Sequence, residues 1–138
     1  MKIVIDTNIF IAAIIKPSTV RRLLIESPIQ LLFPEAILDE IDKHKDEILK
    51  KSGLSPEDYE TVKSTLLRYV EIISTNEIKP FSKRALKIIS EIDKDDAPFI
   101  ATCLGYDAIL WSDDKALKKQ KEIKVLNSAE FSEIFYKH

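Results

Sequence analysis

The sequence predicts an α/β fold with three layers, α/β/α, around a mainly parallel sheet of five strands. Two observations carry this prediction: short apolar runs recur along the chain, and segments with helical character separate them. Since parallel strands need a long crossover connection, usually a helix, this alternation favours parallel pairing. The 138 residues, 45% of them hydrophobic, are enough to bury a real core, and we expect a single domain over residues 1–138.

The first half of the chain predicts two strands, each followed by helices. Lys2–Ile5 is a β-branched run typical of a strand buried on both faces, and Gln30–Phe33 is a second apolar run. Side chains suited to helix capping, a proline at a first helical position and a glycine after a last turn mark the helix ends. The expected helices are Ile9–Ile15, Val20–Glu26, Pro34 to about Lys51, and Ser55 to about Tyr69.

The second half continues the alternation. We expect strands at Glu71–Ser74, Ala108–Trp111 and Lys124–Leu126. The expected helices are Ser82–Ile92, Asp95–Leu104, Lys115–Gln120 and Ser128–Tyr136. The second of these is apolar almost all round, which predicts that it is buried.

Composition excludes several classes of protein. One cysteine, Cys103, rules out a disulfide within the chain, and two glycines rule out a P-loop or a dinucleotide-binding fingerprint. No membrane-length apolar stretch and no secretory signal are present, so we expect a cytoplasmic protein with no membrane contact. The net charge of −2 argues against a uniformly basic coat, although residues 61–90 carry six basic and two acidic side chains.

Acidic residues follow the predicted strands where a parallel sheet forms a cleft. Asp6 follows the first strand, and Asp113 and Asp114 follow Ala108–Trp111. Ligands of open α/β sheets bind at the carboxyl ends of the strands, so these acids meet if the two strands are neighbours. Asp95 and Asp96 open the buried helix that leads into the later strand. Glu40 lies at the border of the stripe that Ile37, Ile41, His44 and Ile48 form at helical spacing along its helix.

Each acid alone has an ordinary structural explanation, because an Asp at a helix start commonly caps it and a helix Glu is commonly solvated. Capping does not explain why acids gather where strand ends should meet. Carboxylates in one cleft repel and raise each other's pKa values unless a cation lies between them. Because the candidate ligands are all oxygen, we expect Mg²⁺ or Mn²⁺ rather than Zn²⁺.

Three motifs together resemble the PIN-domain nucleases, the family that includes VapC-type toxins. They are IVIDTNIFIAAI at the N terminus, ILDEI around Glu40, and DDAPFIATCLGYDAILWSDDKAL near the C terminus. The resemblance implies an acidic quartet of Asp6, Glu40, Asp96 and Asp114, with Asp6, Asp96 and Asp114 as metal ligands. It implies supporting roles for Asn8 and Ser112, and it leaves Asp95, Asp113 and Asp93 as alternates because they adjoin the matched acids.

The resemblance further implies a metal-dependent endoribonuclease that uses Mg²⁺ or Mn²⁺ and leaves a 5′-phosphate and a 3′-hydroxyl. It raises the role of toxin in a toxin–antitoxin pair, with an antitoxin protein as partner and a homodimer as the assembly. Basic side chains beside the first and last motifs are the expected RNA contacts. They are Lys16, Arg21, Arg22, Lys115, Lys118 and Lys119.

Two other functions compete with this interpretation. Asp6 after the first strand could be the nucleophile of an aspartyl-phosphate enzyme, but phosphatases of that kind want a second Asp at position 8, where this chain has Asn8. The other alternative is a catalytically weak PIN-like module that binds RNA or a protein. Metal affinity separates that alternative from the nuclease.

Overall fold

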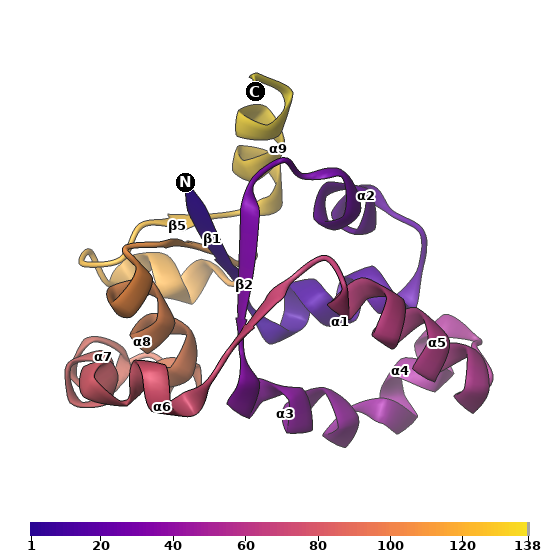
Figure 1. The fold of residues 1–138 in the computed structure, drawn as a ribbon, viewed down its shortest axis with the longest axis horizontal. Coiled ribbons are helices and arrows are strands. Elements are labelled where there is room, and N and C mark those ends of the chain that lie inside the picture. Colours follow the sequence, from indigo (N-terminus) through magenta and orange to yellow (C-terminus); the bar gives the residue numbers. More distant parts are fainter. Residues whose placement is uncertain (138) are drawn as a thin grey trace.

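The computed structural model describes residues 1–137, and its centre is a parallel five-stranded sheet (Figure 1). The strand order is β3-β2-β1-β4-β5, and every neighbouring pair is parallel. The strands are β1 Lys2–Ile5, β2 Gln30–Pro34, β3 Glu71–Ile73, β4 Ile109–Trp111 and β5 Val125–Leu126. The predicted α/β fold and the parallel sheet are therefore confirmed.

The central strand β1 explains why the sheet needs cover on both faces. Its last three residues, Ile3–Ile5, are fully buried, so side chains on both faces of the strand lie in the core. Ile3 lies opposite Leu31 of β2 on one side and Ile109 of β4 on the other. The adjacency of β1 and β4, which the sequence alone left open, is thus established.

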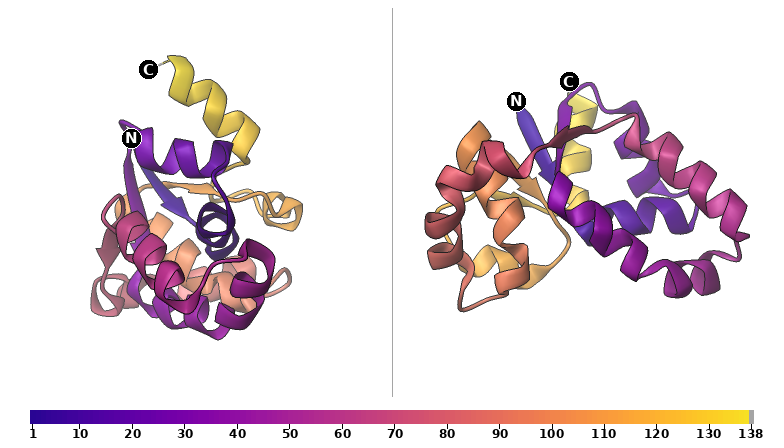
Figure 2. Two further views of the ribbon diagram at one scale, coloured as in Figure 1. Left: turned by 90° about the vertical axis from the view of Figure 1, so that its right-hand side faces the viewer. Right: turned by 60° about the horizontal axis from the view of Figure 1, so that its bottom comes forward.

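Helices cover the sheet in two groups. On one side α1 (Thr7–Ile15) packs against α2 (Thr19–Glu26), α3 (Leu38–Lys43), α4 (Lys45–Ser52) and α5 (Pro56–Leu67), and α9 (Ser128–Lys137) packs against α2. On the other side α8 (Ala97–Tyr106) lies against the central strands and contacts α6 (Thr75–Ile78) and α7 (Ser82–Ile89). Figures 1 and 2 show the two groups on either side of β1 and β2. No helix in the described part of the chain has both the length and the apolar character that crossing a membrane requires.

Chain direction across the sheet reverses once, and the reversal places the candidate site. From β1 the chain moves outward to β2 and β3, and then crosses back to β4 on the opposite side of β1. Right-handed crossovers made in opposite directions put their helices on opposite faces, as observed here. The carboxyl ends of β1 and β4 therefore border the crevice in which open α/β sheets bind ligands.

Two expected elements differ from the structure around the second strand. Pro34 is the last residue of β2, opposite Ile73, rather than the start of a helix. The expected single helix to Lys51 is a 3₁₀ turn, η1 (Glu35–Ile37), followed by α3 and α4, with a break at His44 (φ −95°, ψ 7°). The bend lets both α3 and α4 pack against α1, with Ile41 and Ile48 buried.

Four further differences concern helices and their ends. Ser74, expected in a strand, instead caps α6, which the sequence interpretation missed, by accepting a hydrogen bond from the Glu77 backbone N–H. A 3₁₀ turn, η2 (Lys79–Phe81), leads into α7, which ends at Ile89. Asp95 and Asp96 belong to a 3₁₀ turn, η3 (Lys94–Asp96), ahead of α8, and the basic segment Lys115–Lys119 is the 3₁₀ turn η4 rather than an α-helix.

Candidate active site

The carboxyl ends of β1 and β4 bring Asp6 and Ser112 together. The backbone N–H of Asp6 donates to the carbonyl oxygen of Trp111 at 3.3 Å, which continues the β1–β4 ladder past the end of the strand. The next residue of each strand therefore emerges at the same point of the sheet edge. Asp6 and Ser112 are both buried there, with exposed fractions of 5% and 1%.

Asp6 is held by two hydrogen bonds but faces like charges. Its Oδ1 accepts from the Ile9 backbone N–H at 2.9 Å, so Asp6 caps α1, and its carboxylate also accepts from the Ser112 hydroxyl. Burial, reinforced by the charges of Asp113 and Asp114, raises the pKa of Asp6 to about 6 despite these two hydrogen bonds. Asp6 therefore caps α1, as expected of an isolated Asp, but capping does not compensate the cost of burying its negative charge.

Asp96 is the second carboxyl at this edge, and capping does not explain it. It directly precedes α8, yet its side chain makes no capping hydrogen bond. Asp93 serves the local turn instead, because its carboxylate accepts from the Asp95 backbone N–H at 3.0 Å. Burial raises the pKa of Asp96 to about 7, and the charges of Asp93, Asp6, Asp114 and Asp95 add to the rise.

Asp113 and Asp114 have different surroundings. The two oxygens of Asp113 accept from the Ser128 backbone N–H at 2.6 Å and from the Ser128 hydroxyl at 2.7 Å, which anchors the start of α9. Asp114 uses only Oδ1 for a hydrogen bond, which it accepts from the Ala116 backbone N–H at 3.0 Å. The Ser112 hydroxyl accepts from the Asp114 backbone N–H at 3.1 Å while it donates to Asp6, and it thereby joins the two sides of the site.

The other two predicted polar residues lie on the α1 side of the sheet. Glu40 is half-buried on α3, which follows β2 and contacts α1. Asn8 is exposed on α1 and lines a cavity of about 130 Å³ with His44 and with residues of α4 that include Ile48. Ser112 and Asp114 line a different cavity, of about 350 Å³.

The basic residues expected to contact RNA fall into two groups. The guanidinium of Arg21 donates from Nε to the Ala13 carbonyl at 2.6 Å and from Nη2 to the Ile14 carbonyl at 3.0 Å, which closes the end of α1. Arg22 forms an ion pair with Glu26 at 3.3 Å, and Lys16 is exposed just after α1.

Lys115 and Lys118 line the same 350 Å³ cavity as Asp114, and Lys118 also forms an ion pair with Glu130. Lys119 is exposed at the end of η4. The cations after the last motif therefore lie beside an acid of the site. Arg21, by contrast, has a structural role that its sequence position did not indicate.

The donor set fits a hard divalent cation by its chemistry. Asp6, Asp96 and Asp114 offer carboxylate oxygens only, and none of the ion pairs among residues 1–137 involves any of the three. As the side chains lie, no group of three or more Asp, Glu, His or Cys residues in this range closes on one point. Mutual repulsion of uncompensated carboxylates opposes such closure, and a cation would relieve it.

Sequence reasoning missed Asn127, which lines the cavity beside Asp114. The Asn127 side-chain oxygen accepts from the Glu130 backbone N–H at 2.8 Å, and Glu130 accepts from the Asn127 backbone N–H at 3.0 Å. This reciprocal capping box is legible in the sequence as Asn-Ser-Ala-Glu. Its place next to Asp114 follows only from the pairing of β4 with β5.

Comparisons with known proteins agree with the fold. A family model described as PIN domain matches residues 4–128. Among solved structures, the chain is similar to a crystal structure of VapBC2 from Rickettsia felis bound to a DNA fragment from their promoter. The two chains are 18% identical, the match covers 92% of this chain and 98% of that one, and the TM-score is 0.71, which shows a shared fold. No curated protein sequence matches.

Proposed function

Because this chain belongs to the PIN-domain family, whose members are generally nucleases, we propose that it is a metal-dependent endoribonuclease that cleaves RNA phosphodiester bonds. One observation carries the proposal furthest. The carboxyls of Asp6 and Asp96 emerge at the switch point of the sheet with pKa values of about 6 and about 7, and each is raised in part by the charge of Asp114. Perturbed acids gathered in a crevice are typical of a working site.

The residues divide into distinct roles under this proposal. Asp6, Asp96 and Asp114 would hold Mg²⁺ or Mn²⁺, which when bound supplies a water of lowered pKa and stabilises charge on the scissile phosphate. Ser112 orients Asp6 through its donated hydrogen bond and holds the Asp114 backbone through the one it accepts. Glu40 is a further ligand or accepts the proton of the attacking water, and Lys115 and Lys118 neutralise phosphates beside Asp114.

The partners are proposed on the same footing. The structurally similar protein is a VapBC2 complex bound to a DNA fragment, so we propose that this chain is the toxin of a toxin–antitoxin pair, active as a homodimer in the cytoplasm. An antitoxin would then be a small protein encoded beside this chain. Coexpression followed by co-purification tests the partner, and light scattering of the purified chain tests the dimer.

A non-catalytic module remains a second candidate because the three aspartates do not close on one point as placed. Such a module would bind RNA or a protein without needing a metal. It predicts that millimolar Mn²⁺ neither stabilises the chain nor changes its action on RNA.

Cleavage of a labelled single-stranded RNA tests the nuclease directly. The wild type should cut in Mn²⁺ and stop in EDTA, and Asp96→Asn should lose at least about a hundredfold in rate, since several kcal/mol of charge stabilisation goes with the metal. Asp46→Asn is the matched control, because Asp46 is an exposed acid in the first turn of α4 and lies fifty residues before Asp96 in the chain. Wild-type activity in Asp96→Asn, or equal losses in both variants, would refute the assignment.

A further inference from the structure

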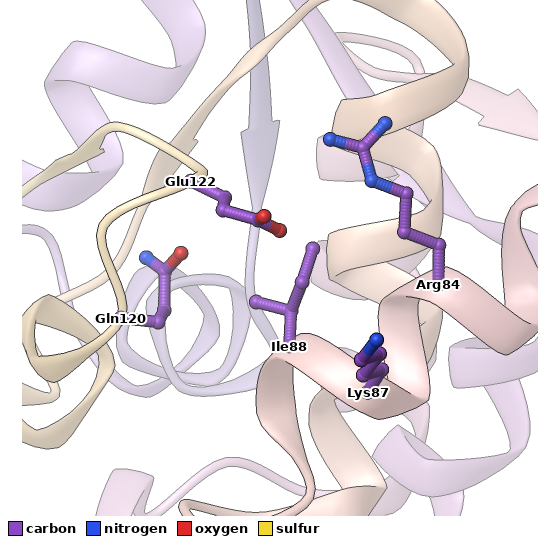
Figure 3. Close-up of a pocket in the computed structure, with 5 residues that line it drawn as sticks. All are labelled: Arg84, Lys87, Ile88, Gln120 and Glu122. Atoms are coloured by element: carbon purple, nitrogen blue, oxygen red, sulfur yellow. The ribbon is translucent and has the colours of Figure 1, made fainter.

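The largest of the described cavities lies outside the acidic site and has no role in the proposed chemistry. It measures about 460 Å³ and opens between α7 and the loop that follows η4. Its lining residues are Arg84, Lys87 and Ile88 from α7, and Gln120 and Glu122 from the loop (Figure 3). Ile88 is the one apolar residue of this lining, and the other four residues are polar or charged, which suits a polar ligand with some apolar surface.

The α7 wall of this cavity is basic and its cations are not used within the described chain. Arg84 and Lys87 are exposed, three residues apart on one face of the helix, and neither takes part in an ion pair among residues 1–137. Lys118, in contrast, is paired with Glu130. Glu122 is the one acidic residue of the lining, so the cavity keeps a net positive charge.

The opposite wall is held in shape. The Gln120 amide nitrogen donates to the Leu117 carbonyl at 3.0 Å and to the Ile123 carbonyl at 2.7 Å, and the Gln120 amide oxygen accepts from the Ile123 backbone N–H at 2.8 Å. Three hydrogen bonds from one side chain fix the turn that carries Glu122. The cavity is thus formed before any ligand arrives, which lowers the entropic cost of binding.

The position of the cavity links it to the acidic site. Its α7 wall packs against η3, which contains Asp96, and its loop wall continues from η4, which begins directly after Asp114. The two segments that carry these acids therefore extend into the two walls. A nucleic acid strand with one phosphate among the carboxylates would reach this basic cavity by following either segment.

We propose that this cavity binds a nucleotide of single-stranded RNA next to the cleaved bond, with Arg84 and Lys87 on its phosphates and the sugar or base against Ile88. A planar guanidinium beside an aliphatic surface suits this ligand, because Arg pairs with phosphate through two N–H groups and stacks on bases. The inference rests on the proposed nuclease function, but its test does not require cleavage.

RNA binding in EDTA tests the cavity separately from catalysis. The affinity of a fluorescein-labelled single-stranded RNA is measured by anisotropy for the wild type and for Arg84→Gln, Lys87→Gln and Lys83→Gln. Lys83 is the matched control, because it is an exposed cation on α7 that does not line the cavity. Arg84→Gln and Lys87→Gln should each weaken binding about threefold to tenfold and lower the salt slope by about 0.7, while Lys83→Gln should do neither.

Glu122→Gln should change the RNA affinity in the opposite direction, which a general loss of stability would not produce. Removal of the one acid of the lining should tighten RNA binding, and unchanged thermal melts should show that all four variants fold. Equal affinities in the wild type and in the Arg84 and Lys87 variants would overturn the inference even if Mn²⁺-dependent cleavage is intact. An equal loss in Lys83→Gln would also overturn it, since that result reports net charge alone.

A mononucleotide titration separates an RNA strand from a free nucleotide as the ligand. Competition of a nucleoside monophosphate against the labelled RNA should be weak in the wild type, because the strand also contacts cations outside the cavity, such as Lys115 and Lys118. If the Arg84 and Lys87 variants lose mononucleotide affinity but keep RNA affinity, the cavity is a small-molecule site and the inference is wrong.

Discussion

Replacement of Asp96 by Asn should stabilise the metal-free protein at pH 8. A carboxyl whose pKa is raised from 3.8 to about 7 on folding favours the folded state at low pH, and that contribution is lost as pH rises through about 7. At pH 8 the ionised Asp96 therefore costs stability, whereas an Asn of the same shape does not ionise. Asp96 makes no capping hydrogen bond, so the substitution removes no structural contact of that kind.

The size of the effect follows from the pKa and the exposure. For a fully buried carboxyl the rise from 3.8 to about 7 would correspond to about 4 kcal/mol. Asp96 is only half-buried, and solvent screening reduces the expected gain to about 1–2 kcal/mol. In a chain of 138 residues that gain raises Tm by about 3–8 °C.

Thermal unfolding followed by circular dichroism, in EDTA at pH 5 and at pH 8, measures this difference. Asp96→Asn should melt above the wild type at pH 8, and most of the gap should close at pH 5. Mn²⁺ should then raise the wild-type Tm, by about 2.7 kcal/mol in stability at a hundred times Kd, and should barely raise that of the variant. The reasoning fails if the variant melts at or below the wild type at pH 8, or if the gap is equal at both pH values.

Three further substitutions test individual contacts. Ser112→Ala removes a donor to Asp6, so the pKa of Asp6 should rise further and Mn²⁺ affinity, read from Tm shifts in a metal titration, should fall about tenfold. Asp113→Ala removes both hydrogen bonds to the start of α9 and should cost about 1–2 kcal/mol in urea unfolding while keeping the Mn²⁺ shift. Arg21→Gln should cost a similar amount, because it frees two carbonyls of α1, and should leave RNA affinity in EDTA unchanged.

The sequence was sufficient for the fold because local and long-range preferences agree in it. The β1 run Lys2–Ile5 has the same bounds in the structure as predicted, since a short β-branched segment has no competing helical pattern. The prediction failed where tertiary packing overrides local preference. The turn at His44 is not marked by Gly or Pro, and the spacing of the buried Ile41 and Ile48 on one stripe is equally typical of an unbroken helix.

The site was predictable in part for the same reason. Asp6 and Asp114 follow strands, so their place at one sheet edge could be expected once the sheet was taken as parallel. What each acid bonds could not be expected, because the partners come from elsewhere in the chain. Ser128, which occupies both oxygens of Asp113, lies fifteen residues away, and Gln120 shapes a cavity whose other wall is α7.

The acids that occur close together in this chain have different roles: Asp93 and Asp113 fix the backbone, and Asp96 and Asp114 are the candidate metal ligands. In one segment Asp93 accepts the hydrogen bond that fixes the local turn, and the Asp96 carboxyl makes no capping hydrogen bond. In the other segment Asp113 anchors the start of α9, and Asp114 uses only Oδ1 in the hydrogen bond to its own turn. A structural carboxylate beside each candidate ligand fixes the backbone and adds negative charge. Of the neighbouring charges, that of Asp93 raises the pKa of Asp96 most. Repulsion among these carboxylates lowers the stability of the metal-free protein, and a bound cation would remove that repulsion and so gain affinity.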